Sequence, residues 1–256
     1  MKTTCLGSSS SGNCFVMEFS MGDGQKPVSL MVECGISYQV ILKRSTPYGI
    51  RLSDLSGCLI THSHKDHCAA ALDLAKRGVQ IYATKGTLDA IGVSGGWPLP
   101  YDKPTPIVNG IKVLAFKVRH DAPEPAGFII KTPFETVVFA IDANEWIDDV
   151  SAIKPNYLFI EANYDPTLMA AEQLSLQRRA SLTDMQKYKL NERIKRSHMS
   201  IDQTMAQISK IKTTNLKAIF LMHLSDRMSA PSLWKQRVTA MTGVPCYVCR
   251  KDVGIE

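Results

Sequence analysis

Three histidines and an aspartate within six residues constrain this chain more than any other feature of its sequence. They stand in the segment Thr61-His62-Ser63-His64-Lys65-Asp66-His67, after a short apolar run and before a helical pattern. Imidazole and carboxylate groups bind divalent metals, and neighbouring side chains on a tight turn diverge to opposite sides of it. A lone histidine before a helix is commonly a cap or a solvated side chain. Four donors at one strand end instead predict a metal site that can hold two ions.

Three further donors each follow a strand-like run later in the chain. They are His120 after residues 111–119, Asp142 after residues 136–141, and His223 after residues 217–222. Ligands at the ends of successive strands converge on one edge of a sheet, where a rigid scaffold can fix the geometry of a metal. We therefore expect these three side chains to join the His62 to His67 segment in a single site.

The apolar periodicity predicts an α/β chain in which strands dominate the start of each half. The expected strands are residues 3–6, 14–19, 28–34, 58–61 and 80–83, and then 111–119, 127–132, 136–141, 157–161, 217–222 and 244–248. Helices are expected at residues 38–44, 68–77, 86–91, 166–196, 200–212 and 231–241, and residues 93–106, rich in Gly and Pro, are expected to form a loop. Two similar halves predict an αββα sandwich of two mixed sheets flanked by helices, as one domain over residues 1–256 with a helical insertion at about 166–197.

Composition narrows the class of protein. The chain has 256 residues, with 45% hydrophobic and 21% charged residues, which is ordinary for a globular protein. No apolar run approaches the roughly 20 residues that a membrane-spanning helix needs, so no membrane partner is expected. The first residues lack the apolar core of a secretory signal, and seven scattered cysteines do not suggest a disulfide framework. A soluble, cytoplasmic protein is predicted.

The charge of the chain bears on its partners. A formal net charge of +6 and a pI of about 8.9 mildly favour anionic partners such as nucleic acid or a nucleotide. Basic residues concentrate between 166 and 196, namely Arg178, Arg179, Lys187, Lys189, Arg193, Lys195 and Arg196. This stretch is predicted to be a lid, the rim of a substrate site or the contact surface of a homodimer.

Together these donors resemble those of the metallo-β-lactamase superfamily. The first motif of that superfamily is matched in full by His62-Ser63-His64-Lys65-Asp66-His67, and its later His, Asp and His are matched by His120, Asp142 and His223. The resemblance covers nearly the whole chain and implies two divalent metal ions, zinc in preference to manganese. It implies that one metal is held by His62, His64 and His120, the other by Asp66, His67 and His223, and that Asp142 bridges them. Two cations about 3.5 to 4 Å apart lower the pKa of a bridging water, and Asp66 could also orient the resulting hydroxide.

Shorter motifs resemble the YycJ/WalJ-like branch of that superfamily, whose members resemble nucleases or phosphodiesterases. These motifs are Gly7-Ser8-Ser9-Ser10-Ser11-Gly12-Asn13, Val32-Glu33-Cys34-Gly35, His120-Asp121-Ala122 and Glu161-Ala162-Asn163-Tyr164-Asp165. The chain departs from the branch in having Glu33 in place of the usual Asp, and Arg196-Ser197-His198-Met199-Ser200 in place of Gly-His-Leu/Val-Ser. Similarity to phosphodiesterases such as tRNase Z implies that Glu161 orients His198, which protonates the leaving alkoxide. A surface histidine before a helix cap is the alternative.

The leading functional hypothesis is a dinuclear-metal hydrolase of phosphodiester bonds in nucleic acid or nucleotides, either exonuclease-like or a cyclic-nucleotide phosphodiesterase. The loop at residues 7–13 could cradle a phosphate or simply join two strands, and Ser9, Asn13 and Asn163 are candidate substrate contacts. A thioester, lactone or β-lactam hydrolase is the alternative, because it would use the same metals, but such a reaction has less need for an acid pair of His198 and Glu161. Flavodiiron-type redox chemistry is disfavoured, since residue 64 is His where a Glu would be expected.

Overall fold

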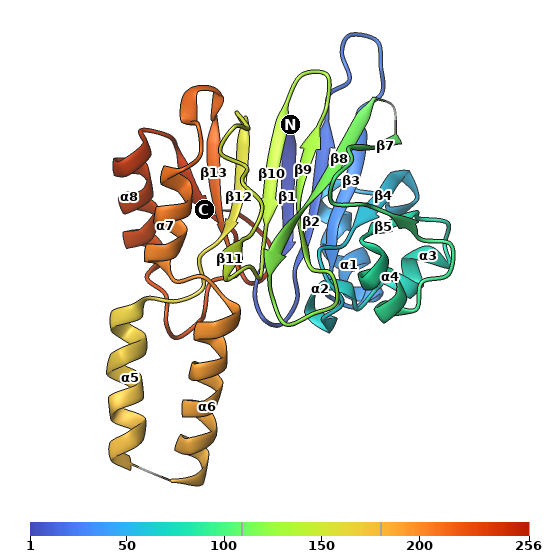
Figure 1. Cartoon of the computed structure of the whole chain (residues 1–256). Coiled ribbons are helices and arrows are strands. Elements are labelled where there is room, and N and C mark those ends of the chain that lie inside the picture. Colours follow the sequence, from blue (N-terminus) through green and yellow to red (C-terminus); the bar gives the residue numbers. More distant parts are fainter. Residues whose placement is uncertain (109, 180, 256) are drawn as a thin grey trace.

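Two mixed β-sheets packed face to face form the centre of the molecule, and helices cover the outer face of each sheet (Figure 1). The computed structural model describes residues 1–108, 110–179 and 181–255. The αββα sandwich predicted from the sequence is confirmed. Both chain termini lie among the strands, and a pair of helices projects away from the sandwich (Figure 1).

The first sheet contains six strands in sequence order. They are β1 (Lys2–Gly7), β2 (Cys14–Phe19), β3 (Val28–Cys34), β4 (Leu55–Leu59), β5 (Ile81–Ala83) and β6 (Trp97–Pro98). The first three pair antiparallel and the last three continue the sheet in parallel from β3. Parallel neighbours require crossovers, which contain α1 (Tyr38–Ser45), α2 (Lys65–Cys68), α3 (Ala71–Ala75) and α4 (Lys85–Ile91). The carboxyl ends of β3 and β4 therefore meet at one edge of the sheet.

The second sheet repeats this plan in the order β11-β8-β9-β10-β12-β13-β14, with β7 paired to β8. Its strands are β7 (Thr105–Val108), β8 (Ile111–Arg119), β9 (Ala126–Lys131), β10 (Thr136–Ala140), β11 (Glu145–Trp146), β12 (Tyr157–Glu161), β13 (Ala218–Met222) and β14 (Cys246–Val248). Because β8 and β10 both run antiparallel to β9, they run parallel to each other, and β12 and β13 share their direction. Four strands thus end at the same edge.

Apolar side chains on both faces of the strands form three buried layers. One lies between the two sheets, and the other two lie between each sheet and the helices that cover it. In β2, Phe15 and Met17 point into the core between the sheets, whereas Cys14 and Val16 point toward the helices on the outside. This alternation follows the two-residue period of a strand, and burial of both faces explains why the strands read as continuous apolar runs. Between the sheets, the rings of Phe159 and Phe220 stack with centroids 4.3 Å apart. On the far side, α7 (Ile201–Ser209) and α8 (Pro231–Thr242) cover the second sheet.

The single helix predicted over residues 68–77 is wrong, because the chain breaks into α2 and α3 there. Tertiary hydrogen bonds replace the helical bond that would join residues 66 and 70. The carbonyl of Asp66 accepts from the backbone N–H of Asn13 at 2.8 Å, and the N–H of Ala70 donates to the carbonyl of Cys34 at 2.9 Å. The predicted loop at 93–106 likewise contains the short strand β6 and the start of β7, and β11 was not predicted. All three strands are short: β6 extends the sheet beyond β5, β7 forms a hairpin with β8, and β11 pairs with β8 from 26 residues further along the chain.

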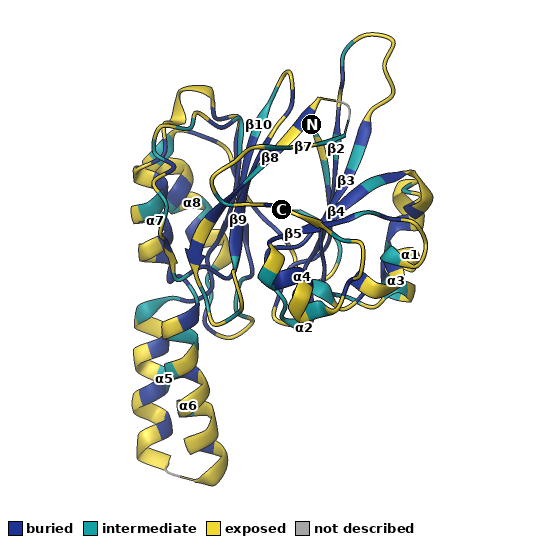
Figure 2. Ribbon diagram, turned by 45° about the vertical axis from the view of Figure 1, so that its right-hand side comes forward, coloured by how far each residue is buried: buried dark blue, intermediate teal, exposed yellow. Residues whose placement is uncertain are grey.

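The segment predicted as a helical insertion forms an antiparallel pair, α5 (Pro166–Arg179) and α6 (Leu182–Ser197). We call this pair the helical hairpin. It extends beyond the sheets, and most of its surface is exposed (Figure 2). Its two helices are joined largely by polar contacts, such as the one from Asn191 Nδ2 to Glu172 Oε2 at 2.7 Å. No helix in the described part of the chain is long and apolar enough to cross a membrane.

Candidate metal centre

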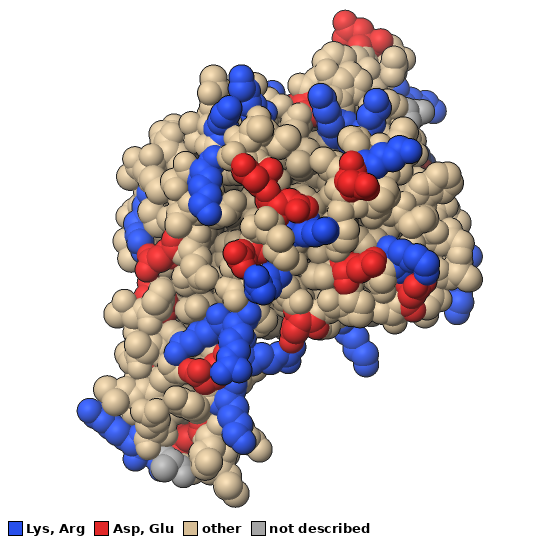
Figure 3. Space-filling view, viewed as in Figure 1, with Lys and Arg blue, Asp and Glu red and all other residues tan. Residues whose placement is uncertain are grey.

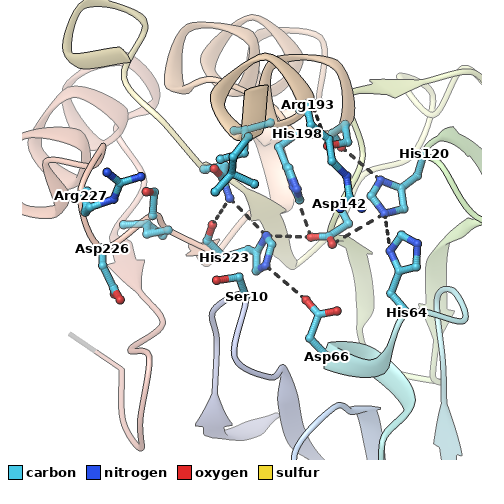
Figure 4. A pocket seen from close by; sticks show the side chains of 16 residues that line it. Ser10, His64, Asp66, His120, Asp142, Arg193, His198, His223, Asp226 and Arg227 are labelled. Carbon is cyan, nitrogen blue, oxygen red and sulfur yellow. Dashed lines mark hydrogen bonds and ion pairs between the residues drawn. The ribbon is translucent and has the colours of Figure 1, made fainter. Parts of the chain in front are cut away.

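The predicted donors gather around one cavity at the edge where β4, β8, β10, β12 and β13 end (Figure 4). The cavity has a volume of about 460 Å³. Its lining includes His64, Asp66, His120, Asp142 and His223. The first sheet supplies the donors that follow β4, and the second sheet supplies those that follow β8, β10 and β13. The site is therefore built across the interface of the two sheets.

Three imidazoles form the first group of donors. Nδ1 of His64 lies 3.2 Å from Nε2 of His62 and 3.1 Å from Nε2 of His120. A neutral imidazole has one nitrogen that donates and one that accepts, so three nitrogens facing one another cannot all be satisfied by hydrogen bonds. Burial lowers the pKa of His62 well below its usual value, and it also lowers the pKa of His120. Both rings are thus held in the neutral form, which is the form that binds a metal.

A second group combines two carboxylates with two imidazoles. Ligand atoms of Asp66, His67, Asp142 and His223 all lie within 4.8 Å of one another. Asp142 is buried, with Oδ2 3.1 Å from Nε2 of His67 and Oδ1 2.7 Å from Nδ1 of His223. Its Oδ2 is also 3.8 Å from Nε2 of both His62 and His120. Asp142 consequently stands between the two groups.

The electrostatics of the second group favour a cation. Burial lowers the pKa of His223, but the carboxylates of Asp142 and Glu161 outweigh that effect and raise the pKa to about 10. The pKa of His67 is shifted in the same direction. Burial lowers it, but Asp142 and Glu33 outweigh that effect and raise it well above the usual value. The negative charge that holds protons on these rings would attract a metal in their place. Nε2 of His223 is buried without a hydrogen-bond partner among the described residues, with Asp66 Oδ2 3.9 Å away. The donors therefore fit two divalent cations.

Left-handed backbone conformations direct several of these side chains. Asp142 and His223, each just past the end of a strand, have φ angles of 48° and 56°, and Glu33 has a φ of 62°. Such conformations cost a non-glycine residue on the order of 1–3 kcal/mol, and they persist where the surroundings enforce them. At His223 the backbone N–H donates to Ser8 Oγ at 2.9 Å, and the carbonyl accepts from Asn163 Nδ2 at 2.9 Å. The scaffold thus fixes where the imidazole points.

Glu33 is a site residue whose contact was not predicted from the sequence. It lies in β3, is fully buried, and its Oε2 is 3.2 Å from Nδ1 of His67. Its Oε1 accepts from the backbone N–H of Thr61 at 3.1 Å. Burial raises the pKa of Glu33. A carboxylate on the far nitrogen of a metal-binding histidine fixes the tautomer and the ring orientation. An acidic residue within an otherwise apolar strand was the signal available in the sequence.

Replacing Glu33 by glutamine is expected to weaken metal binding by about 10- to 100-fold, the usual effect of removing such a partner. The amide keeps the size of the side chain but removes the negative charge that faces His67 Nδ1. Titration of the metal-free protein with Zn²⁺ against a competing chelator would measure the affinity. Glu18→Gln, an acidic residue on the adjacent strand β2, is the matched control and should leave the affinity unchanged. Equal affinity in Glu33→Gln and wild type would exclude this role.

His198 and Glu161 form a close pair beside the second group. His198 caps the carboxyl end of α6, and its Nδ1 lies 2.6 Å from Oε1 of Glu161. Glu161 is fully buried, and its Oε2 accepts from the backbone N–H of Ala143 at 2.9 Å. Burial lowers the pKa of His198, but Glu161 and Asp142 outweigh it, so the pKa is raised. His198 keeps 15% of its side chain exposed and lines the cavity, so the ring can reach a bound molecule.

The candidate substrate contacts differ in where they lie. Ser9 is buried and its Oγ accepts from the backbone N–H of Ser11, while Ser10 lines the cavity instead. Asn13 is fully buried behind α2, where its Nδ2 donates to the carbonyls of Ser9 and Asp66 and lies 3.2 Å from His67 Nε2. Asn163 lines the cavity. The structure thus brings only Asn163 of these three residues to the cavity wall.

Removal of metal is expected to lower the stability of the protein. Without cations the three facing nitrogens of the first group cannot all be satisfied by one another. Metal at 1,000 times its Kd stabilises a protein by about 4 kcal/mol, which for a chain of this size corresponds to a Tm shift of about 8 to 16 °C. Thermal unfolding with and without EDTA would measure the shift, and Zn²⁺ added in excess should reverse it. An unchanged Tm would argue against a metal centre.

Comparison with known proteins places the chain in a family. The family model described as a beta-lactamase superfamily domain matches residues 30–224, which is most of the chain. The chain belongs to the metallo-β-lactamase superfamily. Exodeoxyribonuclease YycJ of Bacillus anthracis is 25% identical over 232 residues, which cover 86% of this chain and 81% of YycJ. Together with the His/Asp clusters, the superfamily match makes this protein a metal-dependent hydrolase.

Two solved structures show how closely the superfamily fold is followed. The metallo-beta-lactamase fold protein YhfI from Bacillus subtilis has a TM-score of 0.69 at 15% identity, over 99% of this chain and 98% of that one. Zn²⁺-bound PqqB from Methylobacterium extorquens has a TM-score of 0.69 at 14% identity, over 98% of both chains. At these identities the two matches establish the fold alone.

Proposed function

We propose that this metallo-β-lactamase superfamily member hydrolyses phosphodiester bonds in nucleic acid or nucleotides. The observation that carries the proposal is the pairing of His198 with Glu161 at 2.6 Å on the wall of the metal cavity. A phosphodiester releases an alkoxide, which is a poor leaving group unless it receives a proton. The relative that covers most of the chain is named an exodeoxyribonuclease, which supports the same chemistry.

The donors divide into two sets under this proposal. His62, His64 and His120 would hold one divalent metal, Asp66, His67 and His223 the other, and Asp142 would contact both. Zinc suits a set of imidazoles and carboxylates, and manganese is the alternative. Bound metals would lower the pKa of a water and stabilise negative charge on the phosphoryl oxygens. Asp66 keeps 26% of its side chain exposed at the cavity, so it can accept a hydrogen bond from the attacking water.

His198 acts on the leaving group in this proposal. Glu161 accepts the hydrogen bond from His198 Nδ1, which fixes the ring and stabilises its protonated form. The carboxyl end of α6 adds partial negative charge next to the same ring, which favours the imidazolium further. His198 can then donate the proton on Nε2 to the departing oxygen. Thiolates leave without such help, so the pair favours phosphodiesters over thioesters.

A panel of substrates tests the proposed function. The metal-loaded protein would be offered bis(p-nitrophenyl) phosphate, 5'-phosphorylated DNA, 3',5'-cyclic nucleotides, a thioester, a lactone and a β-lactam. Turnover of at least one phosphodiester, lost on chelation and restored by metal, is the expected result. Turnover confined to the thioester, lactone or β-lactam would refute the phosphodiesterase and support the alternative hydrolase.

A further inference from the structure

A row of cations leads from the metal cavity along the helical hairpin. Lys189, Arg193 and Arg196 stand on α6 at positions i, i+4 and i+7, and each of them is exposed. This spacing puts all three on one face of a helix, along about 10 Å of its axis. The row ends next to His198, which follows α6 directly. Figure 3 shows Lys and Arg side chains gathered where the hairpin meets the sandwich.

A hollow of about 450 Å³ runs beside this face of α6. Lys189, Arg193 and Arg196 line it together with Tyr188 and Ser197. Arg193 and Ser197 also line the cavity that contains the candidate metal ligands. The two depressions are therefore adjacent, and a molecule bound at the metals could continue into the hollow past Arg193.

The charge of the hollow is not neutralised by its own carboxylates. Asp121 and Glu192 also line it, but Asp121 pairs with Arg193 at 3.2 Å and Glu192 with Lys195 at 3.1 Å. Among the residues that the structure describes, neither Lys189 nor Arg196 forms an ion pair. Arg196 interacts electrostatically with Glu192 without forming an ion pair, so two exposed cations of the described chain remain without ion-pair partners in the hollow, which opens onto the candidate active site. Such a surplus attracts an extended polyanion more than a single small anion.

We propose that this face of α6 binds the phosphate backbone of a nucleic-acid chain whose scissile bond lies at the metals. The inference rests on the proposed phosphodiesterase function and deepens it, because it selects a polynucleotide over a cyclic nucleotide. A cyclic nucleotide has one phosphate, which would occupy the metal centre and leave nothing for Lys189 and Arg196. In a polynucleotide, phosphates beyond the scissile bond reach these side chains.

The test compares two double variants of the metal-loaded protein. Lys189→Gln/Arg196→Gln removes the two unpaired cations and keeps residues that favour a helix. Lys112→Gln/Lys131→Gln is the matched control. These two exposed lysines are neighbours on the adjacent strands β8 and β9, at the end of β8 opposite His120. Fluorescence anisotropy with a labelled phosphorothioate-linked DNA, single-stranded or duplex, would give Kd over a series of salt concentrations. Turnover of bis(p-nitrophenyl) phosphate and of cyclic nucleotides would be measured in parallel.

The salt dependence of binding decides the outcome. Each phosphate contact contributes about 0.7 to the slope of log K against log salt for a single strand and about 0.9 for a duplex. The α6 variant should therefore lose about 1.4 or about 1.8 from the slope, with weaker binding at low salt, while the control keeps the wild-type slope. Turnover of the small substrates should stay unchanged. A wild-type slope in the α6 variant would overturn the inference even if phosphodiesters are hydrolysed, whereas absent phosphodiester turnover would refute the proposed function instead.

Discussion

Replacement of His198 by alanine is expected to lower kcat for hydrolysis of an alkyl phosphodiester, such as a dinucleotide, by about 10²- to 10⁴-fold. The ring contacts Glu161, lines the cavity and lies outside both the first trio of imidazoles and the cluster around His67, although it forms a further group of possible ligands with Asp142, Glu161 and His223. Its loss should remove the proton donor and spare the proposed metal ligands. Steady-state kinetics on the dinucleotide, with metal content determined by mass spectrometry, would give both quantities.

Two substrates with different leaving groups distinguish whether His198 is a general acid or a structural residue. p-Nitrophenolate departs far more readily than an alkoxide, so a general acid contributes less to the hydrolysis of bis(p-nitrophenyl) phosphate. We expect the His198→Ala variant to lose much less activity on that substrate than on the dinucleotide. Equal losses on both substrates, with unchanged metal content, would show that His198 acts by shaping the site rather than by giving a proton.

The second large effect is expected at Asp142. This buried carboxylate lies within 3.8 Å of His62, His67, His120, His198 and His223. Loss of a residue that only supports a metal ligand typically costs about 10- to 100-fold in metal affinity, and loss of a carboxylate that would contact both ions should cost about 100-fold or more. Asp142→Asn should therefore weaken metal binding by that factor and abolish turnover. Metal content after dialysis and a competitive chelator titration would measure the change.

An exposed aspartate provides the control for this variant. Asp102 lies in the connection between β6 and β7, away from the proposed ligands, and Asp102→Asn should bind metal as wild type does. If Asp142→Asn retained two tightly bound ions per chain, the two groups of donors would each bind a metal without a shared carboxylate. The bridging role of Asp142 would then be wrong.

The sequence predicted the convergence of the site because its donors follow strands. His120 and His223 stand directly after apolar runs, and parallel strands bring their carboxyl ends to one edge. Most strand positions were also predictable. A strand that is buried on both faces has apolar residues at almost every position, so it stands out as a continuous apolar run in the sequence. The local sequence pattern was therefore sufficient to predict an element when its own residues also determine where it packs.

Features that depend on distant contacts were not predictable. The break between α2 and α3 arises from hydrogen bonds of Asp66 to Asn13 and of Ala70 to Cys34, and no local pattern indicates either bond. Ser9 was selected from a run of four serines, yet its neighbour Ser10 faces the cavity. The partnership of Glu33 with His67 joins the end of β3 to α2. For the helix break and for Glu33, the decisive partner is far away in the sequence.

The first group of donors draws on both sheets, since His62 and His64 follow β4 and His120 follows β8. A cation held by all three would fasten one half of the chain to the other. Separation of the sheets and release of that ion would then be a single linked process, in which occupancy by metal suppresses opening of the sandwich. Each half alone has an incomplete set of ligands. How tightly the protein retains its metal would therefore report whether the two sheets remain packed against each other.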